Sequence, residues 1–508
     1  MTARTKALLV VTLGALLAGA CGCGDSGASP RRFSWRSWHS CDANGAVTDI
    51  NGLGLSRFEC ATLSVPVSYS DPRGAQIPIS VIRLVASRPY PIGDIVLNPG
   101  GPGGSGVQFL EQAWQTFPES LRARFTLVSF DPRGVGSSEP LQCLTPDGIK
   151  ARIGLNPAPR TARQIKAVVS ADKALVRGCE QNASTAFISS MSTTNTARDM
   201  DRLRVALGQV QLTYLGFSYG TYLGTVYAEM FPKRIRAMVL DGAVPPSVDA
   251  ETGAAQEAAA QETALHDFFA WCVTYHRCGS FSIAPAKSYA ALFARFEKGR
   301  VITAHLQPEF GGQEPVDYGV AVFGVLAALY SKTSWPILGK ALSAAERGDG
   351  SYLAALAYFL GGLNPNGAYS NILSASTATE CLDETTQTTI REHEEFARRL
   401  SKPAPDFGSF AAWSGLTCLY WRDRARTHPA AGAASGAPPL LIIGSTGDPA
   451  TPYAWAKELA KQLPRSTVLT RTGAGHTAYQ FSSCIRKWAD RYLETLRMPP
   501  AGTICASD

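Results

Sequence analysis

The sequence predicts an α/β fold, in which a mostly parallel central sheet is flanked by helices and interrupted by an inserted helical cap. Short apolar runs bounded by Gly and Pro recur along the chain, and several are followed by segments with helical periodicity. Between residues 246 and 435 the pattern changes to Ala-rich, helix-leaning sequence without this alternation. The length of 508 residues is enough for about two or three folding units.

We expect the sheet to consist of short buried strands separated by turn-forming residues. The apolar runs that predict the strands are Ile79 to Val85, Ile95 to Leu97, Phe125 to Phe130, Leu212 to Leu215, Ala237 to Leu240, Leu440 to Ile443 and Thr467 to Thr470. Helices fill the gaps. One is expected to begin at Thr196, where Asp199 three positions later resembles a capping box, and to stop at Gly208. Another runs from about Gly220 to Met230 and is ended by Pro232.

The same changes of pattern divide the chain into segments. These are a signal segment (1–23), the first part of the core (24–245), a helical cap (246–435) and the C-terminal part of the core (436–508). Within the cap, Gly253 to Trp271 and Tyr318 to Tyr330 have helical patterns. A linker rich in Ala, Gly, Ser and Pro, from Pro429 to Pro439, precedes the strand at which the sheet resumes. The cap is therefore expected to be an insertion into one sheet.

The N-terminus has the pattern of a targeting segment. Arg4 and Lys6 precede an uncharged stretch from Ala7 to Ala20, which is shorter than the roughly 20 residues that span a bilayer. The stretch ends in Leu17-Ala18-Gly19-Ala20-Cys21, where small residues before a cysteine resemble a lipobox. Cleavage before a lipidated Cys21 and ordinary signal cleavage after Ala20 both remain open. Either way we expect an exported protein, extracellular or attached to the cell envelope.

The cysteines indicate disulfides, because an exported chain meets an oxidising compartment. Of twelve cysteines, ten remain after Cys21 and Cys23 are set aside. Sequence does not fix their connectivity, but pairing in chain order keeps each bridge local. The pairs expected on this basis are Cys41–Cys60, Cys143–Cys179, Cys272–Cys278, Cys381–Cys418 and Cys484–Cys505. Cys272, His276 and Cys278 imitate a metal cluster, but no second ligand pair with zinc-site spacing follows, so we expect a disulfide loop and no metal.

The charge pattern gives no support to nucleic-acid binding. The formal net charge of +7 is spread over the chain without a basic block or stripe. We expect a monomer with a solvated, mildly basic surface.

A nucleophilic serine is indicated by the pattern Gly216-Phe217-Ser218-Tyr219-Gly220. It follows the strand that ends at Leu215 and opens a helix, which is the setting that a G-x-S-x-G nucleophile elbow requires. The flanking glycines leave room for a sharp turn that projects the serine oxygen from the end of the sheet. Ser218 is therefore the candidate nucleophile.

A serine nucleophile needs a histidine base, itself oriented by a carboxylate. Of seven histidines, His476 alone follows a core strand near the C-terminus, where the chain order Ser, Asp, His places the base. Asp448 lies on the loop after the strand that ends at Ile443, which is the expected position of the acid. Asp241, after the strand that ends at Leu240, is the alternative acid.

Backbone N–H groups must stabilise the oxyanion of a tetrahedral intermediate. We expect one from Tyr219 and a second from the glycine loop after Leu97, with Gly101 preferred over Gly100. The same loop formally matches G-x-G-x-x-G through Gly101, Gly103 and Gly106, and Asp131 follows a later strand. A dinucleotide site is disfavoured, because the loop lies well into an exported chain and the triad would stay unexplained. No organic cofactor is expected.

Together these motifs resemble those of the secreted tripeptidyl aminopeptidases, a branch of the proline-iminopeptidase-like α/β-hydrolases. The motifs that carry the resemblance are Asn98-Pro-Gly-Gly-Pro-Gly-Gly-Ser-Gly106, Asp131-Pro-Arg-Gly-Val-Gly-Ser-Ser138, Gly216-Phe-Ser-Tyr-Gly-Thr221, Asp241-Gly242, Gly447-Asp448-Pro-Ala-Thr-Pro452, Gly473-Ala-Gly-His476 and the tail from Cys484 to Cys505. The resemblance covers the core from about Ser64 to Cys505, whereas the cap is recognised mainly by its position and by Cys381 and Cys418.

The resemblance implies an α/β-hydrolase fold and hydrolysis of peptides from a free N-terminus, releasing tripeptides. Such an enzyme must bind an ammonium group, for which Glu380, Asp383 and Glu384 beside Cys381 are candidates. A solvated acidic turn is the alternative for these three residues. A carboxylesterase or lipase with the same triad, and a non-catalytic cell-surface lipoprotein, are the competing functions.

Overall fold

The computed structural model describes residues 38–41, 58–384, 388–423 and 434–506. The signal segment 1–23, including Cys21, lies outside these ranges. Within them, no helix is both long and apolar enough to cross a membrane.

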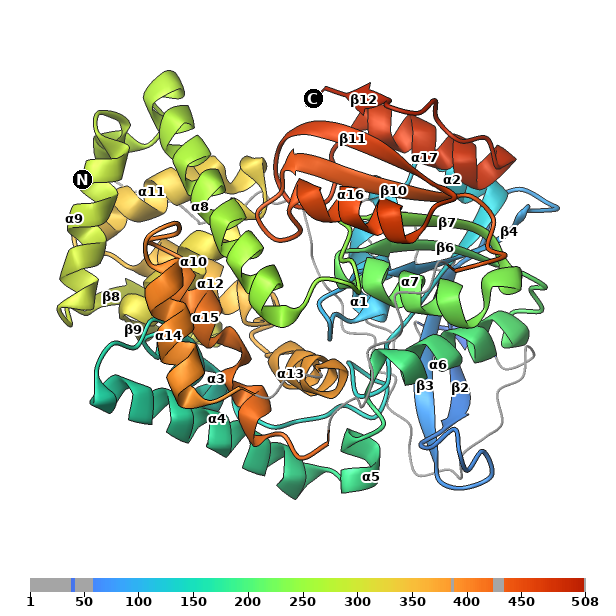
Figure 1. Cartoon of the computed structure of the whole chain (residues 1–508), viewed down its shortest axis with the longest axis horizontal. Coiled ribbons are helices and arrows are strands. Elements are labelled where there is room, and N and C mark those ends of the chain that lie inside the picture. The colour runs from blue at the N-terminus through green and yellow to red at the C-terminus, as the bar shows by residue number, and fades with distance from the viewer. Residues whose placement is uncertain (1–37, 42–57, 385–387, 424–433, 507–508) are drawn as a thin grey trace, which may run out of the picture.

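A ten-stranded sheet forms the centre of the molecule, in the order β1-β2-β3-β5-β4-β6-β7-β10-β11-β12 (Figure 1). The strands are β1 (His39–Ser40), β2 (Phe58–Pro66), β3 (Gln76–Leu84), β4 (Gly93–Asn98), β5 (Phe125–Phe130), β6 (Leu212–Phe217), β7 (Ile235–Asp241), β10 (Leu440–Gly447), β11 (Ser466–Ala474) and β12 (Ile504–Cys505). Pairing is antiparallel from β1 to β5 and parallel from β5 through β4 to β12. The carboxyl ends of the parallel strands therefore share one edge.

Two helical layers cover the sheet, because alternate strand residues point to opposite faces. Ile95 and Leu97 pack with α1 (Gly106–Ala113) and α17 (Ser483–Thr495) on one face. Val96 lies in the core cluster of the other face, which includes residues of α6 (Thr193–Ala206), α7 (Tyr219–Met230) and α16 (Tyr453–Gln462). The short helix α2 (Glu119–Arg124) leads into β5.

Helix α6 corrects one expectation. It begins at Thr193 with Ser192 as its N-cap, not at Thr196 with a capping box to Asp199. The Asp199 carboxylate is instead buried in an ion pair with Arg133, at 2.6 Å between Oδ1 and Nη2. The Asp199 side chain, which the sequence pattern placed in a capping box at the start of the helix, is thus used in a tertiary contact instead.

The cap is a separate helical body beside the carboxyl edge of the sheet (Figure 1). Its elements are α8 (Ala250–Tyr275), α9 (Pro285–Glu297), a hairpin of β8 (Ile302–His305) and β9 (Gln313–Val316), α10 (Tyr318–Leu329), α11 (Trp335–Glu346), α12 (Ser351–Leu360), α13 (Ile372–Asp383), α14 (Ile390–Leu400), α15 (Gly408–Ser414) and the 3₁₀ helix η8 (Gly415–Tyr420). A cluster of buried apolar side chains fills it, and Ile149 and Ile153 from α3 (Pro146–Gly154) belong to that cluster. Part of the interval 24–245, expected as core, therefore packs on the cap.

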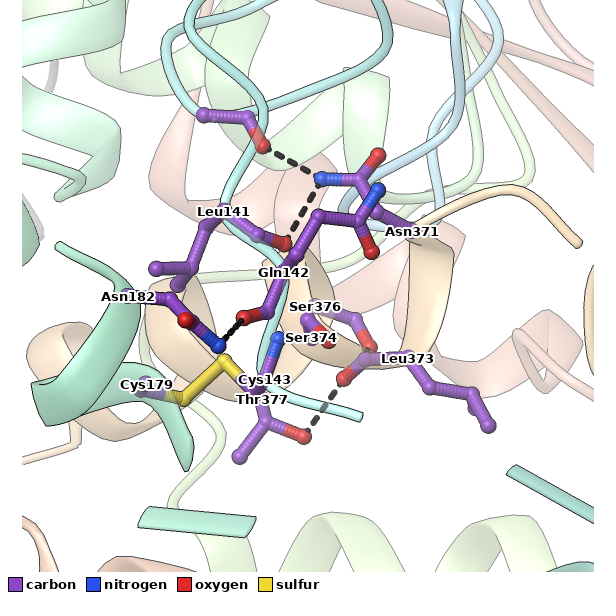
Figure 2. The surroundings of a disulfide bond; sticks show 11 residues. Leu141, Gln142, Cys143, Cys179, Asn182, Asn371, Leu373, Ser374, Ser376 and Thr377 are labelled. Atoms are coloured by element: carbon purple, nitrogen blue, oxygen red, sulfur yellow. Dashed lines mark hydrogen bonds between the residues drawn. A yellow bond between two sulfur atoms is a disulfide. The ribbon is translucent and has the colours of Figure 1, made fainter. Parts of the chain in front are cut away.

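Among the described residues, five disulfides join ten cysteines in chain order, as Cys41–Cys60, Cys143–Cys179, Cys272–Cys278, Cys381–Cys418 and Cys484–Cys505. Cys143–Cys179 connects the loop after β5 to α4 (Ala162–Asn182). Figure 2 shows that this bridge lies next to the start of α13. There the Asn371 amide donates to the carbonyl oxygens of Gly134 and Leu141, at 2.7 and 3.0 Å. The cap helix α13 is thus fastened to the loop that follows β5.

Candidate active site

Ser218 occupies a strained turn between β6 and α7. Its backbone has φ of 54° and ψ of −127°, which a residue with a side chain adopts only when its surroundings impose it. The turn is close-packed, since a Cβ on Gly216 would lie 2.4 Å from the Gly220 carbonyl oxygen. The Ser218 N–H donates to the carbonyl oxygen of Asp241 at the end of β7, at 2.8 Å. The pattern G-x-S-x-G thus forms the elbow that the sequence indicated.

His476 and Asp448 meet at the same edge of the sheet. The Nδ1 atom of His476 lies 2.9 Å from Oδ1 and 3.1 Å from Oδ2 of Asp448. The carboxylate also accepts hydrogen bonds from the N–H groups of Ala450, Thr451 and Thr477, at 2.8–3.1 Å. Because both of its oxygens accept hydrogen bonds, Asp448 has a fixed orientation. It holds the imidazole through Nδ1, which leaves Nε2 pointing away from the carboxylate.

Gly242, which follows β7, lies near both the serine turn and His476. Thr221 Oγ1 donates to the Ser218 carbonyl oxygen at 2.6 Å and lies 3.4 Å from the Gly242 carbonyl oxygen. A Cβ on Gly242 would lie 3.3 Å from His476 Cε1. No hydrogen bond joins the Ser218 hydroxyl to His476 in the described part of the chain. Catalytic hydrogen bonds are often long in ligand-free enzymes and tighten when substrate binds.

Opposing effects set the protonation of His476. Burial alone would lower its pKa, but the Asp448 carboxylate, with smaller effects of Asp241 and Glu257, raises the pKa above its ordinary value overall. The raised pKa makes the imidazole a stronger proton acceptor during a reaction. Because a general base must be unprotonated, it also limits activity at acidic pH.

Asp241, the alternative acid, has a different task. Its carboxylate accepts the N–H groups of Ala478 and Tyr479, at 2.8–3.0 Å, just after the histidine. Burial raises its pKa to about 6 against these hydrogen bonds. Asp241 therefore fixes the loop that carries His476, while Asp448 orients the ring.

The glycine loop after β4 lies directly against the elbow. A Cβ on Gly100 would lie 2.9 Å from Ser218 Cβ and 3.1 Å from the Tyr219 nitrogen. The Gly100 N–H donates to the Asn98 side chain at 3.0 Å, so it is already engaged. The N–H groups of Gly101 and Tyr219 donate to no other atom among the described residues. These two groups are the available oxyanion donors, and Gly100 provides the close approach.

Asp131 is buried beneath this loop and shapes it. Its carboxylate accepts hydrogen bonds from the Ser105 hydroxyl at 2.6 Å and from the N–H groups of Val107 and Ser137 at 3.1 and 2.8 Å. Because this carboxylate is buried and bound by internal donors, it is not accessible to a ribose, which removes the reason for interpreting the glycines as a dinucleotide site. The glycine loop and the loop after β5 are thereby joined.

The cap brings carboxyl groups toward the catalytic edge. Glu380 on α13 reaches solvent, yet burial around it and the nearby Asp383 raise its pKa to about 7. Glu257 on α8 is half-buried, and burial together with Glu380 raises its pKa to about 7, against a lowering effect of His476. No lysine or arginine pairs with Glu257 or Glu380 in the ranges described. The two carboxyl groups thus lie near one another without a lysine or arginine partner among the described residues.

The remaining acidic candidates are used differently. Both Asp383 oxygens accept hydrogen bonds from Thr193 of the core, one from its N–H at 3.1 Å and one from its hydroxyl. Glu384 is the C-cap of α13 and is only partly buried. Sequence reasoning missed Glu257, whose helix has no local motif, and Tyr330, whose ring packs edge-on against His476 at 5.3 Å.

No residue grouping indicates a metal. In the parts of the chain that the structure describes, no three His, Cys, Asp or Glu side chains could hold an ion together. Cys272 and Cys278, whose spacing with His276 resembles that of metal ligands, are joined in a disulfide.

The fold and this site define a serine hydrolase of the α/β-hydrolase class. The family model described as "alpha/beta hydrolase fold" matches residues 95–321, and that described as "TAP-like protein" matches residues 403–505. The chain belongs to this family of α/β-hydrolases with a TAP-like C-terminal region.

Three relatives show how closely the chain resembles known members. It is 33% identical to the serine protease Hip1 of Mycobacterium tuberculosis, over 94% of this chain and 92% of that protein. It is 33% identical to carboxylesterase B of the same species, over 96% and 92%. It is 31% identical to the tripeptidyl aminopeptidase of Streptomyces lividans, over 88% and 84%. The similarity therefore includes the cap as well as the core.

Proposed function

We propose that this hydrolase is an aminopeptidase that releases short peptides, tripeptides among them, from free peptide N-termini. The observation that carries the proposal is that Glu257, which accepts a hydrogen bond from the Gln261 amide at 2.9 Å, and Glu380 have no lysine or arginine partner among the described residues beside the catalytic edge. Burial is the main cause that raises the pKa of both carboxyl groups to about 7, and a cation that arrives nearby stabilises their charged forms, so that they lose their protons. A substrate α-ammonium group is such a cation. The names of two relatives, a serine protease and a tripeptidyl aminopeptidase, agree with a peptide substrate.

The reaction follows from the residues at the sheet edge. Ser218 attacks the scissile carbonyl carbon, while His476 takes the hydroxyl proton and returns it to the leaving amine. Asp448 stabilises the imidazolium, and the N–H groups of Tyr219 and Gly101 bind the oxyanion. Water, deprotonated by His476, then attacks the acyl-enzyme and releases the N-terminal fragment. The distance from Glu257 and Glu380 to Ser218 would set how many residues are removed.

The proposal is tested with a peptide that has either a free or an acetylated N-terminus. We expect Glu257→Gln and Glu380→Gln each to lower kcat/KM for the free peptide by about 10- to 100-fold, the value of one charged hydrogen bond. The acetylated peptide should be cut slowly by all variants. Glu395→Gln, a change of the same kind at an exposed position on α14, is the matched control. Equal turnover of the free and acetylated peptides by the unaltered enzyme would refute an aminopeptidase.

The pH gives a second readout of the same site. Deprotonation of Glu257 and Glu380 through a pKa near 7 should strengthen ammonium binding as the pH rises from 6 to about 7.5. Over this interval the substrate amine keeps most of its charge, because its own pKa is about 8. The preference for the free over the acetylated peptide should therefore grow over this interval, and a constant ratio would count against this role of Glu257 and Glu380.

The relative named carboxylesterase B supports an ester substrate as the second candidate. Comparing a tripeptide amide with a nitrophenyl ester separates the two, since esters are intrinsically easier to cleave. A peptidase should retain strong amide turnover. Labelling of Ser218 by a fluorophosphonate, absent in Ser218→Ala, tests for catalysis of either kind against a silent lipoprotein.

We also propose that the protein is exported as a monomer and attached to the cell envelope by a lipid on Cys21. The sequence from Arg4 to Cys21 supports this. Incorporation of a labelled fatty acid into the full chain but not into Cys21→Ala would support lipidation. Release of both proteins into the medium would support ordinary cleavage.

A further inference from the structure

A chain of hydrogen bonds runs from the cap to Tyr219, whose backbone N–H is an oxyanion donor. The Tyr219 hydroxyl is hydrogen-bonded to Thr193 Oγ1, and that hydroxyl donates to Asp383 Oδ2. Burial raises the pKa of Tyr219 well above its ordinary range, so the phenol keeps its proton. Because the threonine gives its one proton to the carboxylate, the phenol must donate to the threonine oxygen.

Both ends of this chain are fixed. Asp383 is the last residue of α13, and Cys381 two positions earlier is bonded to Cys418 in η8. Thr193 is fully buried at the first turn of α6. The Tyr219 ring also stacks on Tyr222, with centroids 6.1 Å apart and planes inclined by 27°. Rotation of the tyrosine side chain is thereby restricted, and with it the first turn of α7.

We propose that Asp383 is a positioning residue for the oxyanion hole, acting through Thr193 on the side chain and hence on the backbone N–H of Tyr219. An oxyanion donor must lie about 2.7–3.1 Å from the developing charge, so a small tilt of the first turn of α7 weakens it. The carboxylate of the cap sets that tilt from outside the core. This role holds for any acyl substrate and does not depend on the preference for a peptide N-terminus.

The test uses a nitrophenyl ester, so that ammonium recognition plays no part. Thr193→Val keeps the shape of the side chain and removes the bridging hydroxyl, and Tyr219→Phe removes the phenol. We expect each to lower kcat roughly tenfold, less than deletion of a donor, with KM nearly unchanged. Thr193→Ser, which retains the hydroxyl, should stay close to the unaltered enzyme. The double variant should lose no more than either single variant, since all interrupt one chain.

A boronic acid that forms a tetrahedral adduct with Ser218 separates positioning from general damage. Its inhibition constant should rise by the same factor as kcat falls in Thr193→Val and Tyr219→Phe, and Asp383→Asn should follow them. Ser189→Ala, which removes a hydrogen bond to Asp423 at an exposed site, is the control and should change neither. If Thr193→Val melts at a much lower temperature, Tyr219→Phe decides. Unchanged kcat in Tyr219→Phe, a loss confined to KM, or an unchanged inhibition constant would overturn the proposal.

Discussion

The backbone N–H of His476 donates to the carbonyl oxygen of Tyr330, at 2.8 Å, and the Tyr330 ring stands edge-on to the imidazole. Tyr330 directly follows α10 of the cap, so the cap supports the candidate base His476. Burial and the nearby Glu257, Asp448 and Glu380 carboxyl groups raise the pKa of Tyr330 above its ordinary range. The phenol is therefore neutral at every pH at which the enzyme would work.

Replacement of the Tyr330 ring should impair catalysis more than folding. Tyr330→Leu leaves the backbone hydrogen bond intact and removes the ring contact, which is worth about 0.5–1.5 kcal/mol. We expect kcat/KM for a nitrophenyl ester to fall by about 3- to 10-fold. Tyr275→Leu makes the same change at the exposed end of α8, where the ring packs on Trp271. Similar losses of activity in both variants would show that the effect is not local to His476.

Gly100 should tolerate no side chain. An alanine Cβ there would lie 2.5 Å from the Phe217 carbonyl oxygen and 2.9 Å from Ser218 Cβ, at a backbone φ of +92°. We expect Gly100→Ala to abolish labelling of Ser218 by a fluorophosphonate. Gly348 has a similar φ of +96° and open space around its Cβ position, so Gly348→Ala measures the backbone strain alone. That control should lose about 1 kcal/mol of stability and retain activity.

Loss of the Asp448 charge should change both the rate and the pH profile. His476 must be unprotonated to act, and its pKa is raised in the folded protein, so activity should fall as the pH drops through a value above 6.5. Asp448→Asn should lower kcat by roughly 10⁴-fold. It should also move the acid limb of kcat/KM to lower pH, because burial of the ring then acts without the opposing carboxylate. The measurement is ester hydrolysis between pH 5 and 9, and an unmoved limb would contradict the assignment.

The sequence was most informative where single elements are buried on both faces. Every residue of Phe125–Phe130 is buried, and the apolar run alone gave its bounds. The whole of β2 was missed because Glu59 and Thr62 interrupt its apolar pattern. The start of α6 was misplaced because Ser192 and Thr196 are both plausible N-caps, and only the buried contact of Asp199 with Arg133 decides between them.

The candidate site likewise contains residues that sequence patterns predict and residues that they do not. Asp448 and His476 were predicted as neighbours because chain order and strand ends determine where they lie. Glu257, Thr193 and Tyr330 were not, since their positions result from how cap helices dock on the core, and no local pattern encodes docking. The sequence already preferred Gly101 over Gly100 as an oxyanion donor, but only the structure supplies the reason, because the Asn98 side chain takes the Gly100 N–H.

A buried acidic contact in the cap should make the stability of the protein depend on pH. Glu262 on α8 is almost fully buried, and its carboxylate accepts a hydrogen bond from the N–H of Asp406 at 3.1 Å. His266 Nε2 lies 3.8 Å from Glu262 Oε1. Burial and the Asp406 carboxyl group raise the pKa of Glu262 to about 7.

The direction follows from the protons bound. Between the ordinary pKa of 4.5 and the raised value near 7, the folded state holds more protons than the unfolded state, so stability falls as the pH rises through this interval. Glu262→Gln keeps an acceptor for the Asp406 N–H and removes the charge. Its melting temperature should exceed that of the unaltered protein at pH 8 and differ little at pH 5. Exposed Glu395→Gln is the control, and a gain that is the same at both pH values would mean that ionisation of Glu262 does not limit the stability of the cap.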